Sequence, residues 1–167
     1  ELNTKPITNV ILMGLLRPLL DTVNSVSAPV LARERDIDVS ETRSAKESDY
    51  HTLIRLTVKT DRRTRVLEGS LFGGDKPRIV TVEGVPLEAE LSEHMLFIRN
   101  EDKPGFIGAL GTALGAAGLN IANFHLGRTE VGGNAVALIA IDQAPDGNVL
   151  RQVNDLPHVV TVKPMRF

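Results

Sequence analysis

The residues best suited to chemistry lie in one short stretch, Asn100-Glu101-Asp102-Lys103-Pro104-Gly105, between an apolar strand and a helix that begins near Phe106. A strand-to-helix turn points free backbone N–H groups at one place and suits a small anionic ligand. Asp102 adds a carboxylate that can accept an ammonium group, and the amide of Asn100 can donate or accept hydrogen bonds. The stretch holds no nucleophile, general base or set of metal ligands. It therefore predicts a binding site and not a catalytic one.

A second polar position, Asn120, opens the next predicted strand in the sequence Gly118-Leu119-Asn120-Ile121. A zwitterionic amino acid needs an oxygen for its ammonium group and N–H donors for its carboxylate. Asp102 supplies the oxygen, while the amides of Asn100 and Asn120 can serve either end of the ligand. The helix start, whose N–H groups can take the carboxylate, consists of Gly105, Phe106 and Ile107.

Simpler explanations exist for each of these residues alone. An Asp or Asn just before a helix is a common N-cap, and Pro-Gly is common in turns. For Asp102 on its own, capping is the more common role. The combination of Asn100, Asp102 and Asn120 around one strand-helix-strand unit favours effector binding over a ligand-free dimer contact.

The remaining candidate residues do not combine into a catalytic or metal site. The four histidines show no i, i+4 spacing and no carboxylate at ligand spacing, so zinc is not expected. We expect His125 at a surface or an interface. Three serines have no nearby base, which leaves hydrolase chemistry without support. The histidines are His51, His94, His125 and His158, and the serines are Ser25, Ser27 and Ser70.

The composition excludes several classes of protein. The 167 residues are 42% hydrophobic and 24% charged, a globular balance that suffices for one ordinary domain or two small ones. A net charge of −2 gives no reason to expect a nucleic-acid or membrane partner. Without cysteine, disulfides, thiolate metal sites and thiol catalysis are excluded. No apolar run is long enough for a membrane span, and we expect a cytoplasmic location.

The first part of the chain predicts two helices and an antiparallel sheet. One helix runs to Leu20 with Thr8 or Asn9 as its cap, and the second covers Asn24 to Arg35 with Ser27 as its cap. The positions expected to be buried on these helices are Ile11, Leu12, Leu15, Leu16, Leu19, Val30 and Leu31. The expected strands are 37–44, as an edge strand, then 50–60, 64–72, 78–82 and 85–91.

The second part of the chain has a sharper pattern. Strands are expected at 96–100, 121–129, 135–141 and 159–166, and helices at 106–117 and 146–156. The first of these helices should bury Ile107, Leu110 and Leu114 and end at Gly118. The strand at 121–129 should carry an apolar face of Ala122, Phe124 and Leu126. The order βαββαβ predicts the α+β class and a ferredoxin-like sandwich with both helices on one face of the sheet.

The second part of the chain resembles an ACT domain, a small regulatory module that binds amino acids. The resemblance rests on a strand followed by Asn100-x-Asp102-x-Pro104-Gly105 and a helix, and then by Gly118-x-Asn120-Ile121 and a second strand. The resemblance covers residues 95–167. Residues 1–94, with Asn24-Ser25-Val26-Ser27-Ala28-Pro29 and Val66-Leu67-Glu68-Gly69-Ser70-Leu71-Phe72-Gly73, resemble the intervening allosteric substrate-binding (ASB) domain of long-form D-3-phosphoglycerate dehydrogenases. The absence of an initial Met and the lack of catalytic chemistry agree with a regulatory fragment, truncated at the start of its ASB-like domain.

This resemblance implies a ligand and a way of binding it. L-serine is the effector in such dehydrogenases, held between two ACT domains by the residues at the positions of Asn100, Asp102 and Asn120. The chain is therefore expected to bind L-serine or a similar small amino acid and to form homo-oligomers through ACT–ACT pairing. NAD is expected only in a catalytic part upstream, because no G-x-G-x-x-G motif occurs here in a βαβ setting.

The resemblance also suggests a second anion site in the ASB-like domain. Arg78 matches one basic position of that site, and Lys76 lies beside it. Two other basic positions are occupied here by Glu90 and Ala140. A solvated charged edge is the simpler interpretation of these residues.

Two other kinds of protein fit the same pattern. The β subunit or β portion of an iron–sulfur L-serine dehydratase also joins ASB-like and ACT-like domains, with its cluster cysteines elsewhere. A free-standing ACT-type dimerisation or sensing module would have no enzyme attached. The sequence upstream of Glu1 would distinguish these alternatives from the dehydrogenase.

Overall fold

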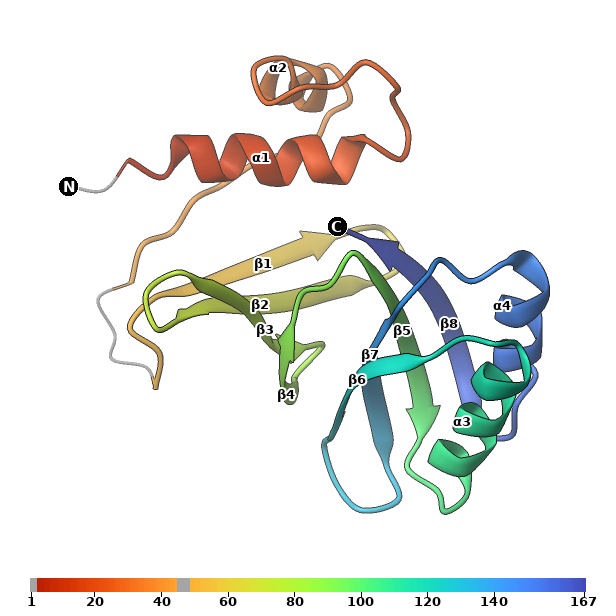
Figure 1. Cartoon of the computed structure of the whole chain (residues 1–167). Coiled ribbons are helices and arrows are strands. Elements are labelled where there is room, and N and C mark those ends of the chain that lie inside the picture. The colour runs from red at the N-terminus through yellow and green to blue at the C-terminus, as the bar shows by residue number, and fades with distance from the viewer. Residues whose placement is uncertain (1–2, 45–48) are drawn as a thin grey trace. The chain divides into compact units, whose positions relative to one another are not determined.

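Four helices and two antiparallel sheets make up the part of the chain that the computed structural model describes, residues 3–44 and 49–167. Their contacts divide the chain into two compact units, Glu1–Glu47 and Ser48–Phe167. The first unit is helical and the second contains both sheets (Figure 1). The domain border expected between residues 94 and 95 stays a prediction.

The helical unit packs α1 (Lys5–Leu16) against α2 (Ala28–Arg33). Its core consists of Leu12, Leu16, Ala28 and Ala32. The cap predicted at Thr8 or Asn9 is wrong. The helix begins after Thr4, because Pro6 fits the first turn, where its missing N–H costs nothing.

Other details of this unit also differ from expectation. Ser27 is the N-cap residue of α2 as predicted, although its side chain makes no capping hydrogen bond. Val30, Leu15 and Leu19, expected to be buried, are all exposed. The edge strand predicted at 37–44 is absent, since the described residues of that segment form no strand. Glu41 instead accepts hydrogen bonds from the hydroxyls of Thr4 at 2.7 Å and Thr8 at 2.5 Å, which ties the segment to α1.

The first sheet is a meander of four strands in the order β1-β2-β3-β4. Its strands are β1 (Leu53–Lys59), β2 (Thr64–Phe72), β3 (Lys76–Val82) and β4 (Val85–Glu90). Each neighbouring pair is antiparallel, β2 has the predicted bounds, and the ends of the other three strands lie within three residues of theirs. Glycines with positive φ form the turn at Gly73 and Gly74, where L side chains would be strained.

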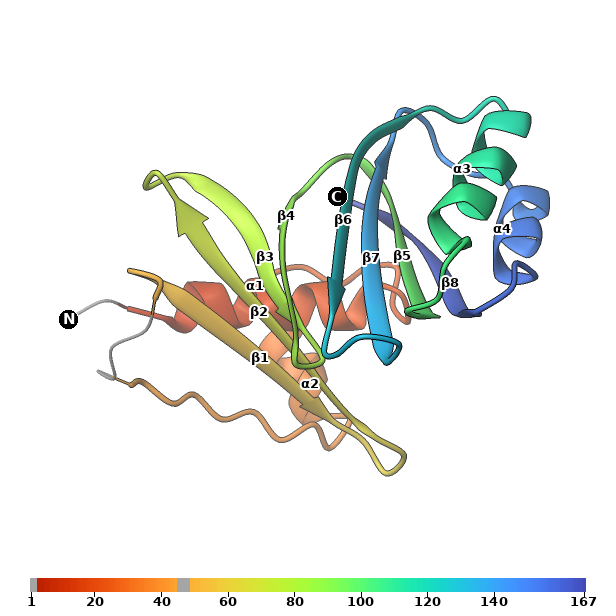
Figure 2. The ribbon, with the colours of Figure 1, turned by 90° about the horizontal axis from the view of Figure 1, so that it is seen from below.

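The second sheet has the order β6-β7-β5-β8 and confirms the predicted ferredoxin-like fold and the α+β class. Its elements in chain order are β5 (His94–Glu101), α3 (Phe106–Ala116), β6 (Ile121–Arg128), β7 (Asn134–Ile141), α4 (Gly147–Asn154) and β8 (Val159–Arg166). Both helices cover one face of the sheet (Figure 2). Gly118 ends α3 with a φ of 70°, and Asp146 caps α4 by accepting from two backbone N–H groups.

Apolar side chains cover both faces of the second sheet. Between the sheet and the helices, Leu96, Ile98, Leu110, Leu114 and Ile139 belong to one buried cluster. On the other face, side chains of β3 and β4 pack against β5 and β7, and the buried members are Ile79, Val82, Val85, Leu87, Ala89, Met95, Val136 and Leu138. The two sheets of this unit therefore share a continuous core.

Three positions of the predicted apolar faces are wrong in this unit. Ile107 is 56% exposed, although a core position was expected. Ala122 and Leu126 are also exposed, because β6 is an edge strand that the helices cover only in part. Among the described residues, no helix has the length and apolarity that crossing a membrane would require.

At Gly127 the backbone of β6 lies close to that of β4, with no room for a side chain. A Cβ atom at this position would collide with the carbonyl oxygen of Pro86 and lie 2.9 Å from Cγ1 of Val85. We expect Gly127→Ala to lower the free energy of unfolding by about 1–3 kcal/mol, since β4 would have to move away from β6. Chemical denaturation followed by circular dichroism measures this change.

Gly115 provides the matched control, because it lies within α3 and a Cβ there meets nothing within 4 Å. Gly115→Ala should stabilise the chain by up to about 1 kcal/mol, since alanine favours a helix interior. Equal stability of the two alanine variants would contradict the close packing at Gly127.

Candidate functional site

The turn between β5 and α3 contains Asp102 and Gly105, two of the residues predicted to bind a ligand. The backbone N–H of Asp102 donates to the carbonyl of Gly133 at 2.8 Å, which fixes the loop to the hairpin between β6 and β7. Gly105 then adopts a left-handed conformation, with φ 94°, and α3 starts at Phe106. Phe106 is buried and anchors the helix start in the core.

Asp102 does not cap α3. The N-cap residue is Gly105, and no side chain makes a capping hydrogen bond there. The carboxylate of Asp102 turns to the neighbouring hairpin, where its Oδ2 accepts from Nη1 of Arg128 at 2.7 Å and from the backbone N–H of Gly132 at 3.1 Å. The simpler explanation for this residue, helix capping, is therefore wrong.

The same two donors keep Asp102 ionised. The hydrogen bond from the Gly132 N–H, followed by the one from Arg128, lowers the pKa of the Asp102 carboxyl below its ordinary value. The side chain of Asp102 remains 19% exposed and that of Arg128 remains 51% exposed. The site therefore presents a fixed negative charge next to a positive one, both within reach of solvent.

A pocket of about 370 Å³ lies at this turn. It is lined by Asp102, Lys103, Pro104, Gly105, Ile107, Gly108, Arg128 and Val131. The exposed position of Ile107 is thus accounted for, because its side chain faces the pocket instead of the core. Phe106 can contribute only its backbone, since its side chain is buried.

Asn100 is the buried member of the predicted set, with 2% of its surface exposed. Its Nδ2 donates to the carbonyl of Glu101 at 2.9 Å. Its Oδ1 is buried and accepts no hydrogen bond from the residues that the structure describes. Leaving a buried acceptor without a hydrogen bond costs about 1–3 kcal/mol. Oδ1 of Asn100 could therefore accept a hydrogen bond from a further donor.

Asn120 lies at the other end of the sheet. β7 pairs with β5 on one side and β6 on the other, with Ala135 opposite Asn100 and Ile141 opposite Ile121. Six residues of strand separate these two ends of β7, or roughly 20 Å. One chain therefore does not bring Asn120 to the pocket. There Asn120 donates from Nδ2 to Oδ2 of Asp142 at 2.9 Å.

Three further residues at this site were not predicted from the sequence: Arg128, Val131 and Gly132. Their position follows from the strand order. β5 and β6 lie on either side of β7 and point in the same direction, so their carboxyl ends lie at the same end of the sheet. A basic residue at the end of the strand 121–129 was the available signal, and it becomes meaningful only once the strand order is known.

Arg78, the basic residue of the second anion site that the resemblance suggests, lies among carboxylates in the structure, and the anion site itself stays a prediction. Nη2 of Arg78 pairs with Glu90 at 2.6 Å, and Nη1 lies 3.9 Å from Glu88. The guanidinium also lies 4.8 Å from the centre of the Phe72 ring. Lys76 begins the same strand and is exposed. Carboxylates thus occupy the place of an anion beside Arg78.

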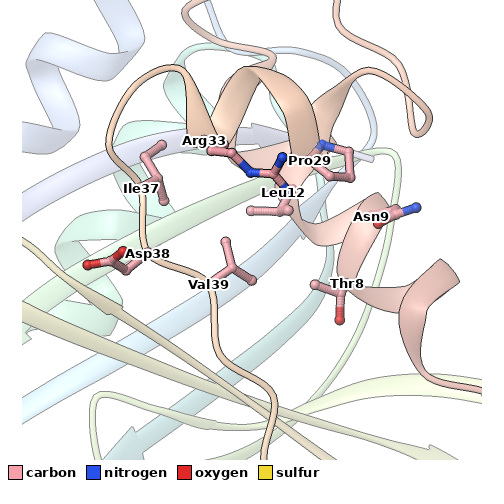
Figure 3. A pocket seen from close by; sticks show the side chains of 8 residues that line it. All are labelled: Thr8, Asn9, Leu12, Pro29, Arg33, Ile37, Asp38 and Val39. Carbon is pink, nitrogen blue, oxygen red and sulfur yellow. The ribbon is translucent and has the colours of Figure 1, made fainter.

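The helical unit contains a separate pocket of about 290 Å³ between α1, α2 and the segment that follows α2 (Figure 3). Leu12, Pro29, Ile37 and Val39 give it an apolar lining, and Arg33 and Asp38 lie at it. None of the residues predicted to bind a ligand lies there. His125 has its Nε2 buried, with no partner among the described residues, and the searched part of the chain holds no group of three potential metal ligands.

Removing Arg128 should change the titration of Asp102 in a defined way. In Arg128→Met the pKa of Asp102 should rise, because one of the two donors is lost, yet remain below its ordinary value, because the Gly132 N–H is the larger cause. Carboxyl-detected NMR titration measures both values. Arg151→Met, on α4, serves as a control that should leave the pKa of Asp102 unchanged.

The lowered pKa of Asp102 also determines how the stability of the folded chain depends on pH. Since the ionised form is favoured in the folded chain, the Asp102–Arg128 pair contributes stability above the ordinary pKa of an aspartate, and the contribution is lost as pH falls through the lowered value. The difference in stability between the wild-type chain and Arg128→Met should therefore shrink in that acidic range. A difference that is independent of pH would contradict the pairing.

Comparison with known proteins supports the resemblance found for each of the two parts of the chain. The D-3-phosphoglycerate dehydrogenase intervening domain model matches residues 1–83, and the ACT domain model matches residues 94–158. The chain is 34% identical to a D-3-phosphoglycerate dehydrogenase of Bacillus subtilis, over 98% of this chain and 31% of that protein. It is 33% identical to the protein of that name from Methanocaldococcus jannaschii, over 95% of this chain and 30% of that protein.

A third relative, the D-3-phosphoglycerate dehydrogenase of Synechocystis, is 33% identical over 96% of this chain and 30% of its own length. The chain thus spans about 30% of the length of these relatives. Their shared name favours the dehydrogenase resemblance over the dehydratase alternative. The chain belongs to the family in which a D-3-phosphoglycerate dehydrogenase intervening domain is followed by an ACT domain.

Proposed function

We propose that this chain is the regulatory part of a D-3-phosphoglycerate dehydrogenase and that it binds L-serine, or a similar small amino acid, between two paired ACT domains. The observation that carries the proposal is the Asp102 carboxylate, which is ionised, freed from helix capping and displayed in a pocket at the start of α3. The choice of serine follows the resemblance to such dehydrogenases, in which L-serine is the effector.

Pairing of two chains would complete the site. β6 is an edge strand of the second sheet, and its ladder pairs it with β7 only among the described residues. In a two-fold dimer, two copies of one edge strand must pair antiparallel. The start of one β6 then lies beside the end of the other. Asn120 of a second copy would thereby come next to Arg128 and Asp102, across the roughly 20 Å that separate them within one chain.

Regulation would follow from binding linkage. A ligand that contacts two chains favours one relative orientation of the pair over another. A coupling of about 1–3 kcal/mol, or about 5–150-fold in affinity, is typical of such systems. An attached catalytic part responds only if its activity differs between the two orientations. NAD and the catalytic chemistry would belong to that part, and the chain described here would need no cofactor. The cytoplasm remains the predicted location.

Calorimetric titration with L-serine tests the proposal. The wild-type chain should bind serine, and Asp102→Ala should lose about 10–100-fold in affinity, because a charge-assisted hydrogen bond to the ammonium group disappears. Asn120→Ala should weaken binding as well, although Asn120 lies far from the pocket of its own chain. Asp61→Ala, in the exposed turn between β1 and β2, is the matched carboxylate control and should bind like the wild type.

Sedimentation velocity on the same samples reports the oligomeric state. Serine should favour the dimer. Mixing equal amounts of Asp102→Ala and Asn120→Ala chains should restore about a quarter of the sites, since random pairing makes about half of the dimers mixed and each mixed dimer contains one intact site of its two. A folded wild-type dimer that releases no heat with millimolar serine would overturn the effector proposal.

A further inference from the structure

The two hydrogen bonds to the Asp102 carboxylate end on the same oxygen. Arg128 and Gly132 both donate to Oδ2, and no hydrogen bond to Oδ1 is found among the described residues. A carboxylate has two oxygens and about four acceptor positions, so Oδ1 is available to a ligand. Asp102 is thus held through one oxygen while the other remains open at the pocket.

Arg128 is only partly used in the same way. Its guanidinium has five N–H donors, and the pair with Asp102 engages Nη1. The side chain is 51% exposed and lines the pocket together with Asp102. A free carboxylate oxygen and free guanidinium donors therefore lie side by side at one edge of the pocket.

This arrangement is the electrostatic complement of a zwitterion. We propose that an amino-acid effector binds beside the intact Asp102–Arg128 pair, with its ammonium group on Oδ1 of Asp102 and its carboxylate on the guanidinium of Arg128. Four charges would then alternate in sign around one ring of contacts, and each would have an opposite charge on both sides. The inference rests on the proposed function, because it concerns how the same pocket selects its ligand.

The hairpin between β6 and β7 prepares this geometry before a ligand arrives. Arg128 ends β6, and Gly132 lies in the turn with a φ of 77°, a conformation that favours glycine. Both donors to Asp102 thus come from one short hairpin, which fixes the carboxylate in advance and reduces the ordering cost of binding. The pocket lining also contains Lys103, but Arg128 is the cation held in place by a hydrogen bond to Asp102, so we expect Arg128 to select for a carboxylate.

The test compares two ligands on matched variants. L-serine carries both charges, whereas ethanolamine keeps the ammonium group and the hydroxyl but lacks the carboxylate. By calorimetry, the wild-type chain should prefer serine by at least about tenfold. Arg128→Met should lose about tenfold or more in serine affinity while ethanolamine binding changes little or improves, so the preference shrinks. Arg128→Lys, which keeps the charge, should restore part of the preference.

Arg151→Met is the control for a general charge effect. Arg151 is an exposed residue of α4 and does not line the pocket. This variant removes the same charge from the chain and should keep the wild-type preference for serine. Circular dichroism establishes that all variants are folded, and a loss of fold alone would weaken both ligands equally.

Each other outcome overturns the inference in its own way. If Arg128→Met keeps the wild-type preference, the carboxylate is bound elsewhere, and the effector site stands without Arg128. If the variant binds serine more tightly, Arg128 competes with the ammonium group for Asp102. If neither ligand binds to any folded variant, the effector proposal fails, and the role of Arg128 fails with it.

Discussion

The central strand β7 is the constraint on which the rest of the second sheet depends. It pairs with β5 along one edge and with β6 along the other, and every residue from Ala135 to Ile141 is buried. Because both neighbours run antiparallel to β7, they are parallel to each other, and their carboxyl ends lie at the same end of the sheet. This arrangement alone brings Asp102, which follows β5, to Arg128, which ends β6. The pocket that Asp102 and Arg128 line together is therefore a consequence of strand order and not of any local motif.

The same pairing also explains why a single chain could not by itself provide the proposed serine site. Asn100 and Asp102 follow β5 at one end of β7, while Asn120 precedes β6 at the other end. No movement of side chains crosses that distance. A site that needs both ends must take one of them from a second chain, and an edge strand such as β6 allows this without rearranging the fold. Binding and assembly are then coupled by geometry, within the function proposed above.

Much of the fold could be predicted from the sequence because its patterns are locally consistent. The βαββαβ order, the start of α3 after Gly105 and its end at Gly118 all follow from periodicity and turn residues. The errors arose where tertiary contacts decide. The segment 37–44 alternates like a strand but has Glu41 bound to α1, and Ile107 has a core-like position in α3 but faces the pocket. Arg128 could not be recognised because its role depends on a neighbouring strand far away in sequence.

Gly127 has a consequence for how sequences of this family are read. It lies one residue before Arg128, so a glycine found at this position in a relative could be attributed to ligand binding. The structure gives a different reason, since the backbone of β4 occupies the space that any side chain would need. A glycine at this position therefore indicates close packing between the two sheets. A relative with a larger residue there must join its intervening domain to its ACT domain differently, even if its ligand residues are unchanged.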